Sequence, residues 1–324
     1  PTNEFYILTN LDAPNNRLME TSSLETNQSN WKEIIAHRNE EQILEMEIFS
    51  KHLVLNERID GLSVLRVIKR NFEDDYYINF DEESFSSWIS RNREFDTNIL
   101  RYVYTSMTIP YSTYDYDMDK KEKVLLKRQE VIGGYSDQEY HSERIFAQSR
   151  DGKRIPISLV YKKSLRSFDA PQNLILYGYG AYGSTEDPYF SSTRLSLLDR
   201  GFIFAIANVR GSQIFGRQSY DDGKLLKKKN TFFDFIDAGK FLINQNYTDK
   251  EHLFCYGGSA GGLLIGAVIN MEPDMWKGAI ASVPFVDVVT TGLDPTIPLT
   301  TYEWVEWGDP REKEYYEYML SYSP

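Results

Sequence analysis

Short apolar runs separated by polar turns fill the first 133 residues of the sequence. The runs are rich in aromatic and β-branched residues, which is typical of β-strands. The predicted strands lie at 5–9, 17–20, 43–49, 52–56, 63–68, 98–104 and 123–127. No long helical periodicity interrupts them, apart from a turn of helix near residues 30–37. Because the runs group at intervals of about 40–50 residues, the pattern favours the blades of a β-propeller, with a β-sandwich as the alternative.

From residue 134 onward the pattern changes to alternating strands and helices. An Asp-Gly pair at 151–152 predicts a tight hairpin turn between strands at 143–148 and 155–161. Further strands are predicted at 173–177, 202–209, 252–256 and 278–282, and helices at 193–198, 231–244 and 260–270. The alternation predicts an α/β domain with a mostly parallel sheet over residues 134–324.

The composition narrows the classes of partner. The chain carries a formal net charge of −12, which argues against nucleic acid or an anionic membrane as the main partner. An acidic surface suits a cationic substrate, although solubility alone also explains it. The single cysteine, Cys255, excludes an intrachain disulfide and fits a reducing compartment, so a cytoplasmic location is expected. No apolar stretch reaches the roughly 18 residues of a membrane span, and no signal peptide is recognisable.

Residues 255–262 read CYGGSAGG and lie between a predicted strand and a predicted helix. This arrangement matches the nucleophile elbow G-x-S-x-G, in which small neighbours let the strand and helix approach while the serine hydroxyl is exposed. Ser259 is therefore the candidate nucleophile, and the N–H of Ala260 is a candidate oxyanion donor. The alternatives are a structural glycine turn with an incidental serine, or a phosphate-binding loop, and no G-K-[ST] follows to support the loop. A second glycine-rich turn at 176–182 offers the Tyr179 phenol as another donor.

Several stretches together identify a family resemblance. YGYGAYG, TRLSLLDRGF, YGGSAGGLLIGAVIN, VPFVDVVTTGLD and IPLTTYEWVEWGDP resemble oligopeptidase B, the basic-residue-specific branch of the prolyl oligopeptidase family of serine peptidases. The resemblance implies an α/β-hydrolase domain, here incomplete, preceded by the last blades of a β-propeller that admits only peptides. It also implies Ser259 as nucleophile, Tyr179 and Ala260 as oxyanion donors and Tyr182 as an aromatic wall of the specificity pocket. No cofactor or metal is expected.

The resemblance also implies acidic side chains that bind basic residues of the substrate. Glu303 matches the first acid of one pair, whereas Val305 replaces the second and Glu306 follows one residue later. A second pair falls on Asp187 and Tyr189, so one acid of that pair is also missing. A single carboxylate can still select Arg or Lys, more weakly. Solvated loop charges are the alternative interpretation of Glu303 and Glu306.

The general base is not evident in the sequence. An α/β-hydrolase triad runs Ser, Asp or Glu, then His, whereas all four histidines (37, 52, 141 and 252) precede Ser259 and are expected to be ordinary surface or partly buried residues. The triad acid and base are therefore expected beyond residue 324, and the chain is expected to be a fragment lacking both ends. The predicted function is hydrolysis of short, basic peptides after Arg or Lys. An esterase or thioesterase on the same fold and an inactive, peptidase-like binding protein remain as alternatives, and the oligomeric state is not indicated.

Overall fold

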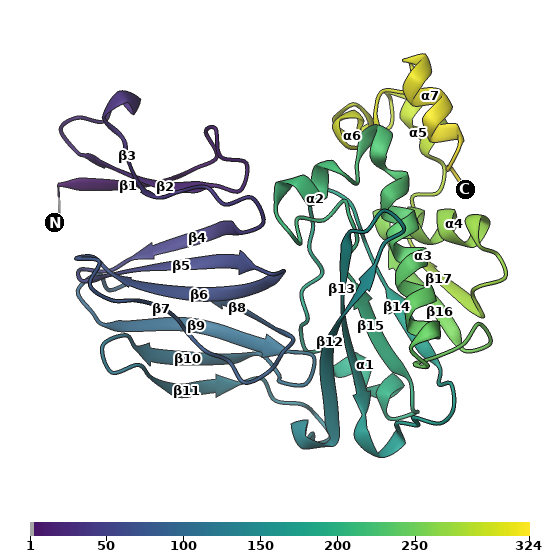
Figure 1. Ribbon diagram of the computed structural model, residues 1–324, viewed down its shortest axis with the longest axis horizontal. Helices are drawn as coiled ribbons and strands as arrows, with labels where there is room; N and C mark the ends of the chain where they lie inside the picture. Colours follow the sequence, from purple (N-terminus) through teal and green to yellow (C-terminus); the bar gives the residue numbers. More distant parts are fainter. Residues whose placement is uncertain (1–2) are drawn as a thin grey trace. The chain divides into compact units, whose positions relative to one another are not determined.

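Two units make up the structure, a computed structural model that describes residues 3–324 (Figure 1). The first unit extends to Glu130 and includes residues 215–217, and the second comprises residues 131–214 and 218–324. The predicted boundary, after residue 133, falls close to this division. Each unit has buried apolar clusters of its own.

The first unit consists of antiparallel β-structure. A three-stranded sheet contains β1 (Glu4–Thr9), β2 (Arg17–Ser22) and β3 (Lys32–Ile35). Two four-stranded groups follow, the first with β4 (Gln42–Ile48), β5 (His52–Ile59), β6 (Leu62–Lys69) and β7 (Asp75–Tyr77), the second with β8 (Phe85–Ile89), β9 (Ile99–Ser106), β10 (Ser112–Asp117) and β11 (Glu122–Arg128). Strands within each group pair in antiparallel fashion in chain order, whereas one parallel bridge between β6 and β8 joins the groups. Four such strands form a propeller blade.

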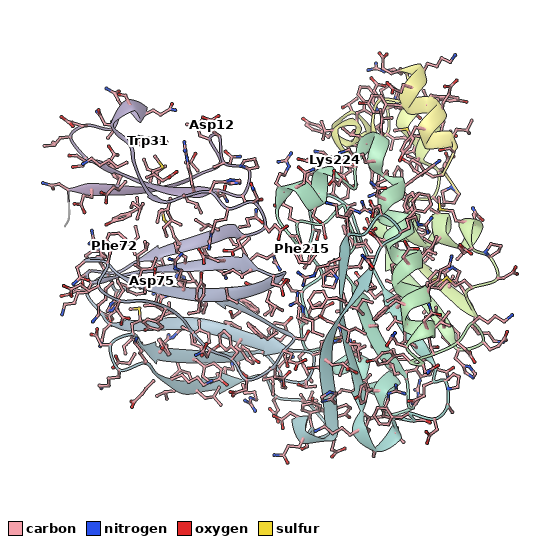
Figure 2. All side chains as sticks on the ribbon, in the orientation of Figure 1. Asp12, Trp31, Phe72, Asp75, Phe215 and Lys224 are labelled. Atoms are coloured by element: carbon pink, nitrogen blue, oxygen red, sulfur yellow. The ribbon has the colours of Figure 1, made fainter. Side chains whose placement is uncertain are left out.

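Buried polar side chains connect the two four-stranded groups. The Ser63 hydroxyl donates to the Ser87 carbonyl at 2.6 Å, and the Ser87 hydroxyl donates to the Ser63 carbonyl at 2.8 Å. Asn56 Nδ2 also donates to the Ser87 carbonyl, at 3.0 Å. Within the first group, Arg66 Nε on β6 donates to the carboxylate of Asp75 on β7, which is labelled in Figure 2, at 2.7 Å.

The sequence pattern missed several strands of this unit. The turn of helix expected near residues 30–37 is wrong, because β3 occupies Lys32–Ile35 after a short 3₁₀ turn at Gln28–Asn30. β7, β8 and β10 were not predicted. β8 buries two serines and β10 alternates tyrosine with polar residues, so neither has the continuous apolar run that the prediction relied on.

A six-stranded mixed sheet forms the centre of the second unit. It consists of β12 (Tyr140–Gln148), β13 (Arg154–Lys162), β14 (Leu174–Tyr177), β15 (Ile203–Ala207), β16 (Leu253–Gly258) and β17 (Gly278–Ser282), in the spatial order β12-β13-β15-β14-β16-β17. β12 and β13 form the predicted hairpin, and β13 pairs antiparallel with β15. The other pairs are parallel, so the carboxyl ends of β14, β15, β16 and β17 lie at the same edge of the sheet.

Seven helices accompany this sheet in the described part of the chain. They are α1 (Ser192–Leu198), α2 (Arg217–Asp221), α3 (Lys229–Asn244), α4 (Ala260–Met271), α5 (Val288–Leu293), α6 (Thr300–Trp307) and α7 (Lys313–Leu320). α4 packs against β16 and β17, and α3 packs against α4 and the hairpin. The prediction missed α2, α5, α6 and α7, each of eight residues or fewer. Within residues 3–324, no helix has the length and apolar character needed to cross a membrane.

Candidate active site

Ser259 lies at the sharp turn between β16 and α4. Its backbone has φ 56° and ψ −118°, a strained conformation for a residue with a side chain. The end of β17 and the segment after it hold this conformation in place: the Ser259 N–H donates to the Ser282 carbonyl at 3.0 Å, and the Phe285 N–H donates to the Ser259 carbonyl at 3.1 Å. The side chain is exposed, as a nucleophile must be.

The glycines around Ser259 make this close approach possible. A Cβ on Gly257 would lie 2.3 Å from the Gly261 carbonyl oxygen, and one on Gly261 would lie 2.7 Å from the Gly178 carbonyl oxygen. Both neighbours are backbone atoms, which cannot move without distorting the chain. Gly258 differs, since its nearest neighbour, the Ser282 carbonyl oxygen, would lie at 3.5 Å. Both glycines that the elbow pattern specifies are therefore required by packing, whereas Gly258 is not.

Two oxyanion donors are candidates beside the serine. Tyr179 follows β14, and its phenol lies beside Ser259. Burial raises the pKa of Tyr179, and the neighbouring Ser259 side chain opposes this only in part, so the phenol remains a proton donor at neutral pH. Ala260 is the first residue of α4, where backbone N–H groups have no partner within the helix. The structure thus brings Ser259, Tyr179 and Ala260 together at the carboxyl edge of the sheet.

A pocket of about 240 Å³ opens next to Ser259 and Ala260. Its walls are mainly apolar and come from the segment after β17 and from α5, α6 and α7. Lining residues include Phe285, Val288, Ile297, Trp304, Trp307 and Met319. Glu303 on α6 and Tyr182 also line it, so two of the predicted substrate-binding residues meet here.

Glu303 is held in this pocket through one of its two carboxylate oxygens. Its Oε2 accepts hydrogen bonds from the Tyr182 hydroxyl at 2.6 Å and from Trp307 Nε1 at 2.9 Å. Burial and this bond to Glu303 raise the pKa of Tyr182, which keeps its phenol protonated. Oε1 has no hydrogen-bond partner within residues 3–324. The arrangement fixes the carboxylate and leaves one oxygen for a cation.

Glu306 does not line the pocket. Its side chain is buried, Oε1 accepts from the Tyr182 N–H at 2.9 Å, and Oε2 accepts from the Tyr220 hydroxyl at 2.6 Å. Glu306 lies three residues after Glu303, about 60° away around α6, so its partners Tyr182 N–H and Tyr220, and not the helix period, hold it behind the pocket. Val305 is 72% exposed and also lies outside the pocket lining. Neither glutamate is a solvated loop charge, because both lie on α6 and are bonded.

Asp187 does not join this pocket. It is half-buried in the loop after Tyr182, where its carbonyl accepts from the Tyr189 N–H at 2.9 Å. The neighbouring Glu186 was not singled out from the sequence. Burial raises the pKa of Glu186, and the neighbouring Tyr177 phenol opposes this increase in part. No sequence signal marks Glu186, since its environment depends on the packing of distant residues.

The histidines lie elsewhere. None of the four lines the pocket in the described part of the chain. His252 pairs with Asp249 at 2.6 Å, and His52 is fully buried on β5, which corrects the expectation of a surface or partly buried residue. Among residues 3–324, no group of three or more His, Cys, Asp or Glu side chains could hold a metal ion.

An exposed serine on a strained turn, with donors beside it and a parallel sheet beneath it, defines an α/β-hydrolase fold with a nucleophile elbow. Comparison with known proteins narrows this class. Residues 188–324 match the prolyl oligopeptidase family, and residues 1–129 match its N-terminal β-propeller domain. The chain belongs to the prolyl oligopeptidase family. The predicted fold class is confirmed, and the β-sandwich alternative is wrong.

The similar proteins include peptidases from bacteria and trypanosomatids. Dipeptidyl aminopeptidase BI of Pseudoxanthomonas mexicana is 48% identical over 320 residues, which are 98% of this chain and 44% of that protein. Protease 2 of Moraxella lacunata is 42% identical over 322 residues, 99% of this chain and 46% of that protein. The structure of oligopeptidase B from Trypanosoma brucei with covalently bound antipain is 41% identical, with a TM-score of 0.90, covering 100% of this chain and 47% of that one. The chain therefore spans about half the length of these relatives.

Proposed function

We propose that this chain carries the nucleophile and the specificity pocket of a serine oligopeptidase that cleaves short peptides after Arg or Lys. One observation carries the proposal: the exposed Ser259 lies beside Tyr179 and lines a pocket that contains a fixed carboxylate, Glu303. A hydrolase of neutral acyl esters would not need a charged group there.

In the proposed mechanism, Ser259 Oγ attacks the carbonyl carbon of the scissile peptide bond while a general base removes its proton. The carbonyl oxygen becomes an oxyanion, which accepts hydrogen bonds from the Tyr179 phenol and the Ala260 N–H. Collapse of this intermediate breaks the C–N bond, and the base returns the proton to the leaving amine. Water then attacks the acyl-enzyme by the same steps and regenerates Ser259. By the chain order of α/β-hydrolases, the histidine base would follow Ser259 in the full-length protein.

The pocket supports a basic residue at the cleavage site. Its apolar walls can cover the methylene stem of Arg or Lys, and Glu303 Oε1 can accept from the guanidinium or ammonium group. One carboxylate in place of a pair predicts a weaker preference than that of a two-acid site. The similar oligopeptidase B from Trypanosoma brucei carries covalently bound antipain, which is consistent with a nucleophilic residue in that enzyme.

The test is turnover by the full-length protein of peptides that differ only in Arg, Lys or Pro before the cleaved bond. We expect the basic peptides to be cleaved faster, and Ser259→Ala to lower kcat by at least about 10⁴-fold. A fluorophosphonate probe should label the wild-type protein and not the variant.

Three outcomes would contradict the proposal. Equal turnover by Ser259→Ala would exclude this serine as the nucleophile. Preference for neutral acyl esters over basic peptides would favour the esterase or thioesterase alternative. Absence of labelling and of turnover in the full-length protein would favour a peptidase-like binding protein.

A further inference from the structure

The turn that presents Tyr179 has an unusual backbone. Gly180 and Tyr182 both adopt positive φ angles, 72° and 57°, on either side of the fully buried Ala181. Gly180 cannot carry a side chain, since a Cβ would lie 2.4 Å from Thr231 Cγ2. Tyr182 does carry a side chain, so its conformation costs about 1–3 kcal/mol. Contacts with the surrounding structure must offset this cost and keep the turn in its conformation.

A buried cation contacts one side of the turn. Lys228, at the start of α3, is 1% exposed, and its Nζ donates a hydrogen bond to the Gly180 carbonyl. The same ammonium lies 4.9 Å from the centre of the Trp307 ring, a favourable cation–π position. Trp307 also donates to Glu303 at 2.9 Å. Lys228 therefore touches the two elements that form the site, the turn and α6.

A buried anion contacts the other side. Glu306 is also 1% exposed, and it accepts from the Tyr182 N–H at 2.9 Å and from the Tyr220 hydroxyl at 2.6 Å. Burial lowers the pKa of Lys228 to about 8, and the attraction of Glu306 opposes this decrease. At neutral pH the lysine is therefore still an ammonium group. The two charges hold the backbone on both sides of Ala181.

We propose that Lys228 and Glu306 are positioning residues: together they hold the 178–182 turn so that Tyr179 faces Ser259 and Tyr182 closes the Glu303 pocket. The inference deepens the proposed function and rests on it. Glu306 attracts Lys228, so removing both buried charges together should cost less stability than removing either one alone. Two charges placed at the turn that carries both site tyrosines indicate a role in geometry.

The experiment compares Lys228→Met and the double variant Lys228→Met/Glu306→Gln with the wild type in the full-length protein. The double variant removes both charges, so no charge is left buried alone if the single variant fails to fold. The matched control is Lys227→Met, which removes the adjacent lysine, 56% exposed and paired with Asp222. Each variant is measured for thermal unfolding, kcat, KM and the rate of fluorophosphonate labelling.

We expect the double variant to fold with a melting temperature close to that of the wild type. Its kcat and labelling rate should fall at least about tenfold, because the Tyr179 donor is displaced from the oxyanion. KM for the Arg peptide should rise as Tyr182 releases Glu303, while Lys227→Met should leave all these values unchanged. Wild-type kcat, KM and labelling rate in a folded double variant would overturn the inference.

A crystal structure of the double variant gives a readout that does not depend on activity. We expect the Tyr179 hydroxyl to move away from Ser259, and an unchanged 178–182 turn would overturn the inference. Failure of the proposed function is distinguishable, because it would appear as missing turnover in the wild type, whatever the variant structure shows.

Discussion

At the scale of single residues, the proposed binding of a basic side chain in the pocket depends on one carboxylate, that of Glu303. Glu303 Oε2 is occupied by Tyr182 and Trp307, which leaves Oε1 for a substrate cation. We predict that Glu303→Gln raises KM for an Arg peptide at least about tenfold, because a charge-assisted hydrogen bond contributes about 1.5–3 kcal/mol. Steady-state kinetics with Arg and neutral peptides measure this effect, and the neutral peptide should change little.

Val305 supplies the matched control on the same helix. It is 72% exposed and does not line the pocket, so Val305→Ala should leave both KM values unchanged. If Glu303→Gln affected Arg and neutral peptides equally, the carboxylate would be shaping the pocket and not selecting charge.

At the scale of elements, the junction of β16 with α4 depends on two glycines. We predict that Gly261→Ala lowers the free energy of unfolding by about 1–3 kcal/mol, because the new Cβ would lie 2.7 Å from the Gly178 carbonyl oxygen. Gly258→Ala is the control, since its Cβ would meet nothing closer than 3.5 Å. Denaturant unfolding of both variants measures the difference, and equal losses of stability would contradict this explanation of the turn.

At the scale of the whole chain, we expect the net charge of −12 to influence how cationic peptides reach the site. An acidic surface attracts cationic peptides over distances that salt screens. We predict that kcat/KM for a dibasic peptide falls several-fold between about 0.05 and 0.5 M salt, whereas kcat/KM for an uncharged ester stays nearly constant. Equal decreases of kcat/KM for both substrates would show that salt acts on the enzyme itself and not on the association of the cationic peptide with it.

The sequence predicted most of the elements that carry the site. The strand before Ser259, the helix after it and the glycines between them were all evident, because strand and helix periods and steric limits at a turn are local properties of the chain. Strands with buried serines, such as β8, and the short helices α5, α6 and α7 were missed. Their stability comes from partners elsewhere in the fold, which leave no periodic pattern.

By itself, then, the sequence determined the elbow, the candidate nucleophile Ser259 and the presence of acids near residue 303. Only the tertiary structure decided which acid lines the pocket and which is buried behind it. Glu303 and Glu306 lie three residues apart, yet their roles depend on Tyr182, whose partners on α6 are 121 and 124 positions away in the chain. The role of Lys228 could not be inferred from the sequence either, because its hydrogen-bond partner Gly180 lies 48 positions away in the chain. The role of a charged side chain depends on its burial and on the partners that folding brings to it. Neither can be inferred from the neighbouring residues in the sequence.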